Sequence, residues 1–415
     1  MDKTLAKKRN RIERIKDKGL QKVLAPAALV ILYAFFAVFG RNFMSYTTLV
    51  NILDSSYYIG FIAIGVTFVI ITGGIDLSVG TVMMCAAIIG GTAYKTWGWP
   101  MWLSLLLIIF VGFLFGVFNG LLVAKLKLPP FIATLGTMMI SKGVGSIVSN
   151  VRSATFPVRS ESNGWFKNIF KYITKDNISI PTGAIILFGV AFICYVILFK
   201  TKMGRYIFAI GSNKEAARLS GIDVEMWEMM VYIIAGIAAG IGGIAFAAIY
   251  TTVMPAQGAG FELYAIAGAV IGGTSLSGGI GTISGTLIGV YIMSVLRTGL
   301  PSMNLQSHYQ TFFTGVVVIL AVLLDIYKTN KAAQEKILTP AEQYKQSMNE
   351  KIDDLKQSLS AASESKSQGI MDEIAALSKE RNHTYSRVRA EEKTEQARIK
   401  REEKLAQKAM NKKML

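Results

Sequence analysis

Mostly apolar stretches, separated by short polar segments, follow one another along the first three quarters of the chain. Their approximate bounds are 23–39, 47–71, 79–93, 102–123, 131–149, 180–199, 229–252, 261–274, 282–295 and 309–327. A helix needs about 20 such residues to cross a bilayer, so the pattern predicts an all-α integral membrane protein. We expect a bundle of about ten transmembrane helices. The second, eighth and ninth stretches look short or glycine-broken, which leaves eight spans as the alternative.

The pattern changes at both ends of this region, which predicts three parts. Residues 1–22 form a basic N-terminal segment, residues 23–327 a transmembrane domain, and residues 328–415 a charged helical tail. Apolar residues in the tail recur every three or four positions, at Tyr344, Met348, Ile352, Leu355 and Leu359. This spacing predicts long helices or a coiled coil, with a break over 358–369 and a second helix over 370–410.

Lysine and arginine residues indicate the topology. The positive-inside rule places the N-terminal segment, residues 125–127, residues 200–228 and the tail in the cytoplasm, and residues 150–180 outside. A ten-span count agrees with this assignment, so both termini are expected to be cytoplasmic.

The amino-acid composition excludes several chemical functions for this chain. The chain has 415 residues, of which 52% are hydrophobic and only 17% are charged, and its net charge is +17. In a membrane protein this positive charge indicates topology and contact with anionic lipid, not nucleic-acid binding. Cys85 and Cys194 lie in apolar stretches and are expected to be buried free thiols. Two histidines are too few for a histidine-based metal or catalytic cluster. The sequence also lacks the G-x-x-x-x-G-K-[ST] loop that binds nucleotide phosphates. We therefore expect no cofactor and no enzymatic activity on this chain.

One polar string interrupts the apolar pattern, I-T-G-G-I-D-L-S-V-G at residues 71–80. A carboxylate between two apolar stretches is costly in lipid, so Asp76 should face the bundle interior, a water-filled path or a membrane interface. The simpler interpretation is that Asp76 and Ser78 cap the following helix. The glycine pattern recurs at Gly272, Gly273 and Gly279, and ten spans would place both glycine turns on the same side.

The string G-G-I-D-L-S-V-G resembles the signature of monosaccharide permeases of ATP-driven importers, the ribose, xylose, arabinose and methyl-galactoside type. The succession N-G-L…P-P-F-I-A-T-L-G-T-M from Asn119 to Met138 is similar to the same family, and the resemblance covers about 23–327. It implies a homodimeric permease in the bacterial cytoplasmic (inner) membrane. The implied partners are a cytoplasmic ATPase that binds ATP and Mg, and an extracytoplasmic sugar-binding protein. The extended length favours the galactose/methyl-galactoside branch.

Residues 203–222 resemble the coupling segment of importer permeases, through which the ATPase is engaged. The residues that carry this resemblance are Gly211, Asn213, Glu215, Ala216, Ala217, Ser220 and Gly221. Ser212 or Asn213 should cap a short helix, with Glu215 in its positive first turn and Gly221 at its end. The alternative is an ordinary helix that links two spans.

A path for a sugar needs hydrogen-bonding groups along the spans. The candidates for the path or its gate are Asn51, Thr72, Gly73, Gly74, Asp76, Ser78, Asn119 and Thr134, with Thr67, Thr137 and Gln257 as further polar positions. Each can equally be a polar group that serves helix packing. Glu262 is expected to be an N-terminal helix charge at the outer interface.

Three other classes fit parts of the sequence. A branched-chain amino acid permease of the same superfamily is disfavoured by the D-L-S-V-G string. A secondary transporter driven by an ion gradient usually has ionisable groups in mid-span, and only Asp54, Asp76 and Glu262 come near. A structural membrane scaffold is disfavoured by the coupling segment.

Overall fold

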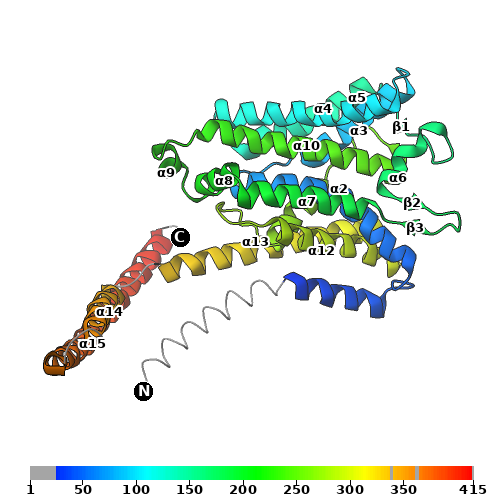
Figure 1. The fold of residues 1–415 in the computed structure, drawn as a ribbon. Helices are drawn as coiled ribbons and strands as arrows, with labels where there is room; N and C mark the ends of the chain where they lie inside the picture. Colours follow the sequence, from blue (N-terminus) through cyan, green and yellow to red (C-terminus); the bar gives the residue numbers. More distant parts are fainter. Residues whose placement is uncertain (1–24, 337–339, 360–363, 414–415) are drawn as a thin grey trace. The chain divides into compact units, whose positions relative to one another are not determined.

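The structure, a computed structural model, describes residues 25–336, 340–359 and 364–413 (Figure 1). The basic N-terminal segment expected at residues 1–22 lies outside the described residues. The chain divides into two compact units, Met1–Thr329 and Asn330–Leu415.

Apolar helices make up the first unit. Seven are long enough to cross a membrane: α2 (Tyr46–Ile71), α4 with its π-helical end (Met101–Lys125), α5 (Pro130–Val148), α7 (Gly183–Lys200), α10 (Val224–Tyr250), α12 (Ile283–Ser302) and α13 (Ser307–Lys336). Three are shorter: Ala25–Phe39, α3 (Val79–Lys95) and α11 (Phe261–Ile271). These helices confirm the predicted all-α membrane class, and each corresponds to one of the predicted stretches.

The prediction of which helices are short was wrong for two of them. The second and ninth stretches form the continuous helices α2 and α12, whereas α3 and α11 are the short ones. The glycines of α2 serve close packing and do not break the helix. A Cβ at Gly60 would lie 2.8 Å from Leu187 of α7, and one at Gly65 would lie 2.8 Å from Ala238 of α10.

Small elements gather at the two ends of this bundle (Figure 1). One end carries α8 (Lys202–Ser212) and α9 (Lys214–Leu219), and we call it the α8–α9 end. The opposite end, the strand end, carries α6 (Lys167–Phe170) and two short antiparallel pairs. These pairs are β1 (Ala154–Thr155) with β4 (Thr252–Val253), and β2 (Tyr172–Ile173) with β3 (Ser179–Ile180).

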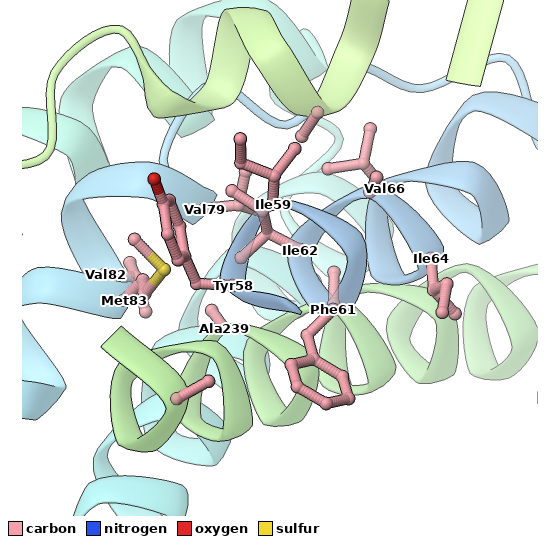
Figure 2. Close-up of a cluster of buried hydrophobic side chains, with 14 of the residues drawn as sticks. Tyr58, Ile59, Phe61, Ile62, Ile64, Val66, Val79, Val82, Met83 and Ala239 are labelled. Carbon is pink, nitrogen blue, oxygen red and sulfur yellow. The ribbon is translucent and has the colours of Figure 1, made fainter. Parts of the chain in front are cut away.

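Helix α2 occupies the centre of the bundle. It is apolar on every side, and its apolar window is entirely buried among α3, α7, α10, α11 and α12. Figure 2 shows side chains leaving α2 in several directions, with Tyr58 beside Val82 and Met83 of α3. A helix that is hydrophobic all round belongs in an interior, and α2 therefore acts as the axis around which the others pack.

Helices α4 and α10 cross with their backbones in contact. Gly112 and Gly116 of α4 face Gly236 and Gly240 of α10, and both pairs have the G-x-x-x-G spacing. A Cβ at Gly112 would collide with the carbonyl oxygen of Gly236, and a Cβ at Gly236 with that of Gly112. Such small-residue faces let helices associate in lipid by close van der Waals packing.

The tail unit is a pair of helices, α14 (Pro340–Leu359) and α15 (Glu364–Lys413). The predicted stripe from Tyr344 to Leu359 is buried or half-buried, which confirms it. The Ala341 amide donates to Glu392 (2.7 Å) and Arg381 donates to Asn349 (2.6 Å), so the helices run antiparallel. The predicted break over 358–369 was too wide. Helix α14 continues to Leu359, α15 begins at Glu364, and 360–363 lie outside the described residues.

The glycine crossing generates a stability prediction. Gly112→Ala should lower the free energy of unfolding by about 1–3 kcal/mol, because the new methyl group forces α4 and α10 apart. Thermal unfolding of the detergent-solubilised protein measures this change. The matched control is Gly136→Ala on α5, where a Cβ meets nothing within 4 Å. There the better helix propensity of alanine should leave stability unchanged or slightly raised. Equal stability of both variants would contradict the crossing.

Candidate functional site

An irregular segment, residues 72–78, joins α2 to α3, and Asp76 organises its end. The Oδ1 atom of Asp76 accepts hydrogen bonds from the amide (2.8 Å) and the hydroxyl (2.6 Å) of Ser78, the residue before α3. Gly73 has a φ of +82°, a conformation that favours glycine. The carboxylate therefore holds the amide of the residue before α3, whereas the predicted capping by Ser78 is not seen, because the Ser78 side chain makes no cap hydrogen bond to α3.

Asn119 of α4 completes a polar cluster with Asp76 and Ser78. Its Nδ2 donates to the Ser78 hydroxyl (2.8 Å) and, at 3.4 Å, to Oδ2 of Asp76. Asp76 is only 2% exposed, and the described residues offer it no basic partner within ion-pair distance. Phe115 and Gly236 line a small recess beside the cluster, which has no space for a water molecule. The cluster offers no positive charge to bind an anion.

Helix α3 begins partway along α5, not at the end of the bundle. Thr134, in the first turn of α5, donates weakly to the Ile75 carbonyl (3.3 Å). Ser141, two turns further along α5, donates to the Thr81 hydroxyl (2.8 Å). Seven residues of helix span about 10 Å, so the chain rises roughly that far along α5 between Ile75 and Thr81, the third residue of α3.

The start of α11 lies beside the start of α3. A Cβ on Gly80 would lie 2.6 Å from the Gly258 carbonyl oxygen and 2.7 Å from Oε2 of Glu262. Glu262 is an N-terminal helix charge, as predicted, but it is only 7% exposed and lies inside the bundle. The expectation that it sits at the outer interface was wrong, because α11 is a half-length helix that begins in the interior. Oε1 accepts from the Gly260 amide (2.8 Å), and Oε2 has no partner among the described residues.

The predicted coupling residues form the short helix α9 and its flanks. The Asn213 side chain caps it by accepting from the Ala216 amide (2.9 Å), and Glu215 pairs with Arg218 (2.8 Å). Gly221 has a φ of +81°, just past the helix end. Ala217 faces inward, whereas Glu215, Ala216 and Ser220 are exposed. Helix α9 thus presents a small, mostly solvent-facing surface.

Two contacts hold α9 in place and leave an apolar tip uncovered. Lys214 forms an ion pair with the buried Glu228 of α10 (2.6 Å). Ala217 packs with Ile210 and Val224 in a small apolar cluster. Leu219 is 88% exposed at the end of the helix.

Gly211, at the end of α8, belongs to a three-way backbone junction. A Cβ on Gly211 would collide with the Ile71 carbonyl oxygen at the end of α2 and would lie 2.6 Å from the Gly279 amide nitrogen. The Gly279 amide donates to the same Ile71 oxygen (2.8 Å), and a Cβ on Gly278 would lie 3.1 Å from the Gly73 amide nitrogen. The junction brings both glycine turns to the α8–α9 end, on the same side.

The other predicted path residues do not join these clusters. Asn51 is exposed near the strand end of α2, and the Thr72 hydroxyl bonds within its own turn. Gly74 packs against Tyr232 and Val69. The remaining polar positions bond to helix backbone or to a neighbouring side chain: Thr67 to Ala63 and Thr286, Thr137 to Ala133, and Gln257 to Met254.

Sequence reasoning missed two basic residues inside the bundle. Lys142 lies in the second half of α5, and Arg297 lies in α12 over the rings of Tyr58, Phe261 and Tyr264 at 5.2–5.6 Å. Charged residues within apolar helices are themselves the signal that could have found both. Cys85 and Cys194 are buried free thiols, as predicted. In the described part of the chain, no three His, Cys, Asp or Glu side chains gather into a possible metal site.

Comparison with known proteins extends these observations. Residues 48–322 match the family described as branched-chain amino acid transport system / permease component. The chain is 37% identical over 303 residues to the ribose import permease protein RbsC of Escherichia coli (strain K12), covering 72% of this chain and 91% of that protein. It is 36% identical to RbsC of Bacillus subtilis (strain 168), covering 76% and 97%.

A third relative carries another sugar in its name. The galactose/methyl galactoside import permease protein MglC of Escherichia coli (strain K12) is 34% identical over 334 residues, covering 77% of this chain and 97% of that protein. The identities of 34–37% do not single out one sugar. No solved structure matches the chain.

The Asp76 cluster predicts different outcomes for two substitutions. Asp76→Asn should be tolerated, because the amide oxygen can still accept from Ser78. The free Oδ1 of Asn119 can turn to accept from the new amide nitrogen. Asp76→Ala should cost about 1 kcal/mol of stability, since it removes the acceptor of the Ser78 amide hydrogen bond. Thermal unfolding and transport at matched membrane levels measure both. Complete loss of transport in both variants would show that the charge itself is required.

Proposed function

Because the chain belongs to the branched-chain amino acid transport system / permease component family, we propose that its membrane unit forms the translocation path of an ATP-driven monosaccharide importer. The observation that carries this proposal is its similarity, along nearly the whole length of the relatives, to proteins named ribose and galactose/methyl galactoside import permeases. A fructose import permease protein, FrcC of Rhizobium meliloti, is 32% identical. These names favour a sugar over a branched-chain amino acid.

The interior carboxylates also disfavour a secondary transporter driven by an ion gradient. Asp76 accepts hydrogen bonds from Ser78 before α3, and Asp54 pairs with Lys171 at 2.7 Å. Glu262 accepts from the backbone at the start of α11. Each of the three thus makes a structural contact, while Oδ1 of Asp54 and Oε2 of Glu262 have no hydrogen-bond partner among the described residues.

The α8–α9 end is proposed to face the cytoplasm and to seat the ATPase, which would bind ATP and Mg. Its exposed residues Glu215, Ala216 and Ser220 and the apolar Leu219 offer a small surface with one protruding side chain. The strand end would then face the extracytoplasmic binding protein. We further propose that the permease acts as a homodimer in the bacterial inner membrane, with both termini cytoplasmic.

The Gly211 junction supplies a route from the docking surface to the path. Backbone of α8 touches both the end of α2 and the glycine turn after α11, with no side chain between them. Closely packed backbone transmits displacement because it has little room to deform. A movement of α9 against its partner would therefore shift the inner ends of α2 and of the α11 turn together.

The proposal that ATP drives transport can be tested with the reconstituted importer. Proteoliposomes that hold this chain with a cognate ATPase and binding protein should take up sugar only when ATP is supplied to the ATPase side. The chain contains no phosphate-binding loop of its own, so the ATPase must hydrolyse the nucleotide. Uptake of radiolabelled ribose, galactose and fructose measures the activity. Gradient-driven uptake by the purified chain without ATP would refute the importer proposal.

The junction predicts an uncoupled variant. Gly211→Ala should lower transport by about tenfold or more, because its Cβ collides with the Ile71 carbonyl and displaces the end of α2. Membrane level and co-purification with the ATPase should stay unchanged. Ser212→Ala, at the exposed neighbouring position, is the matched control and should transport normally. Normal coupling in Gly211→Ala would rule out the junction as the route.

A further inference from the structure

We propose that a recess between α3, α5 and residues 254–257 binds the hydroxyl groups of a monosaccharide, with Lys142 and Gln257 as its main hydrogen-bonding side chains. This inference rests on the proposed importer function and locates a substrate site within it. The recess is lined by residues of all three segments. It is separate from the recess beside Asp76 and Asn119.

The lining of the recess is amphipathic in the way a sugar requires. Thr81, Ser141, Lys142 and Gln257 contribute polar groups, and Met84 and Met254 are among its apolar walls. Ligand sites typically combine an apolar surface with a few placed polar groups that fix orientation. The C–H faces of a sugar can pack on the methionines while its hydroxyls meet the polar edge.

Lys142 is the residue that most needs an explanation. It lies in the membrane-spanning helix α5, is half-buried, and its ammonium has no hydrogen-bond or ion-pair partner within the described ranges. Intramembrane charges are rare and usually mark substrate pathways. The nearby acid is Glu262, whose charge interacts with that of Lys142 and whose Oε2 atom is buried without a partner. The Lys142 ammonium therefore has unused hydrogen-bond donors, and the Glu262 carboxylate has an unused acceptor.

The recess adjoins the place where two helices are broken. Thr81 belongs to the first turn of α3, and Gln257 lies four residues before α11 begins. Transporters commonly bind substrate where discontinuous helices leave polar backbone and helix ends inside the membrane. The same break that Asp76 stabilises thus brings polar groups to the wall of the recess.

The segment that carries Gln257 is anchored at both ends. Tyr250 and Phe261 flank it, and Phe261 packs under Arg297 while the Tyr250 hydroxyl lies 3.4 Å from that of Tyr58. Thr251 receives a hydrogen bond from Lys167 of α6. Burial, with the positive charge of Arg159, lowers the pKa of the Lys167 ammonium to about 8.

Two glycines in left-handed conformations follow the segment. Gly258 and Gly260 have φ values of +110° and +98°. In this structure the recess has no space inside it even for a water molecule. A monosaccharide therefore enters only when residues 254–257 move outward, and the structure shows the closed form.

Sugar protection of a thiol tests the site directly. Met254→Cys, in a Cys85→Ser and Cys194→Ser background, is labelled with N-ethylmaleimide in proteoliposomes that hold the complete transport complex. Met254 lines the recess and is 54% exposed. Ribose, galactose or fructose at saturating concentration should slow its labelling. Met44→Cys, exposed and outside the recess, is the matched control and should be unaffected. Labelling at residue 254 that no transported sugar slows would refute the site.

Substitutions of the polar groups give an independent measure. Lys142→Met and Gln257→Leu should each lower uptake by about tenfold, as expected for one lost hydrogen bond to substrate. Lys142→Arg should restore part of the uptake. Ser146→Ala, one turn further along α5, is the control, because the Ser146 hydroxyl bonds only to its own helix.

The outcomes separate this site from the importer proposal. If the unsubstituted complex takes up none of the sugars, the importer function itself fails. If it takes up sugar while Lys142→Met and Gln257→Leu transport normally, the function stands and the site is wrong. If Lys142→Met does not reach the membrane, protection at residue 254 still decides.

Discussion

Backbone amides and carbonyls that leave a helix inside a membrane must find partners within the protein, and this constraint shapes the whole bundle. The irregular segment before α3 is satisfied by the Asp76 carboxylate and by Thr134. The turn after α11 is satisfied by Asp325 of α13, which accepts from the Leu276 amide (3.0 Å), and by the Ile71 carbonyl. Asp76 and Asp325 therefore bond to residues at the breaks between helices.

Much of the architecture could be predicted because apolar periodicity marks helices well. The ten stretches, the Asn213 cap and the Asp76–Ser78 pairing all follow from local sequence. The starting depth of α3 and α11 does not, because hydropathy carries no information on where along the bundle a helix begins. That depth depends on contacts such as Gly80 with Glu262, which lie far apart in the chain. The predicted interface position of Glu262 was wrong for this reason.

The candidate site was likewise only partly predictable from the sequence. Asp76, Ser78 and Asn119 come together, whereas Asn51 and Thr72 remain apart from them. Lys142 and Arg297 lie within apolar stretches, where a charged residue is itself a signal in the sequence. The aromatic rings around Arg297 come from α2 and α11, which lie far apart in the chain, so only the folded structure reveals that they surround the cation.

The crossing of α4 and α10 has a consequence for inherited variation. Every amino-acid change that one base substitution can produce in a glycine codon adds at least a Cβ atom. At Gly112, Gly116, Gly236 and Gly240 that atom has no space, because each position faces the backbone of the opposite helix. Missense mutations at these four codons therefore carry a structural cost whatever base is changed. Gly136 and Gly143, on the open side of α5, face no such limit.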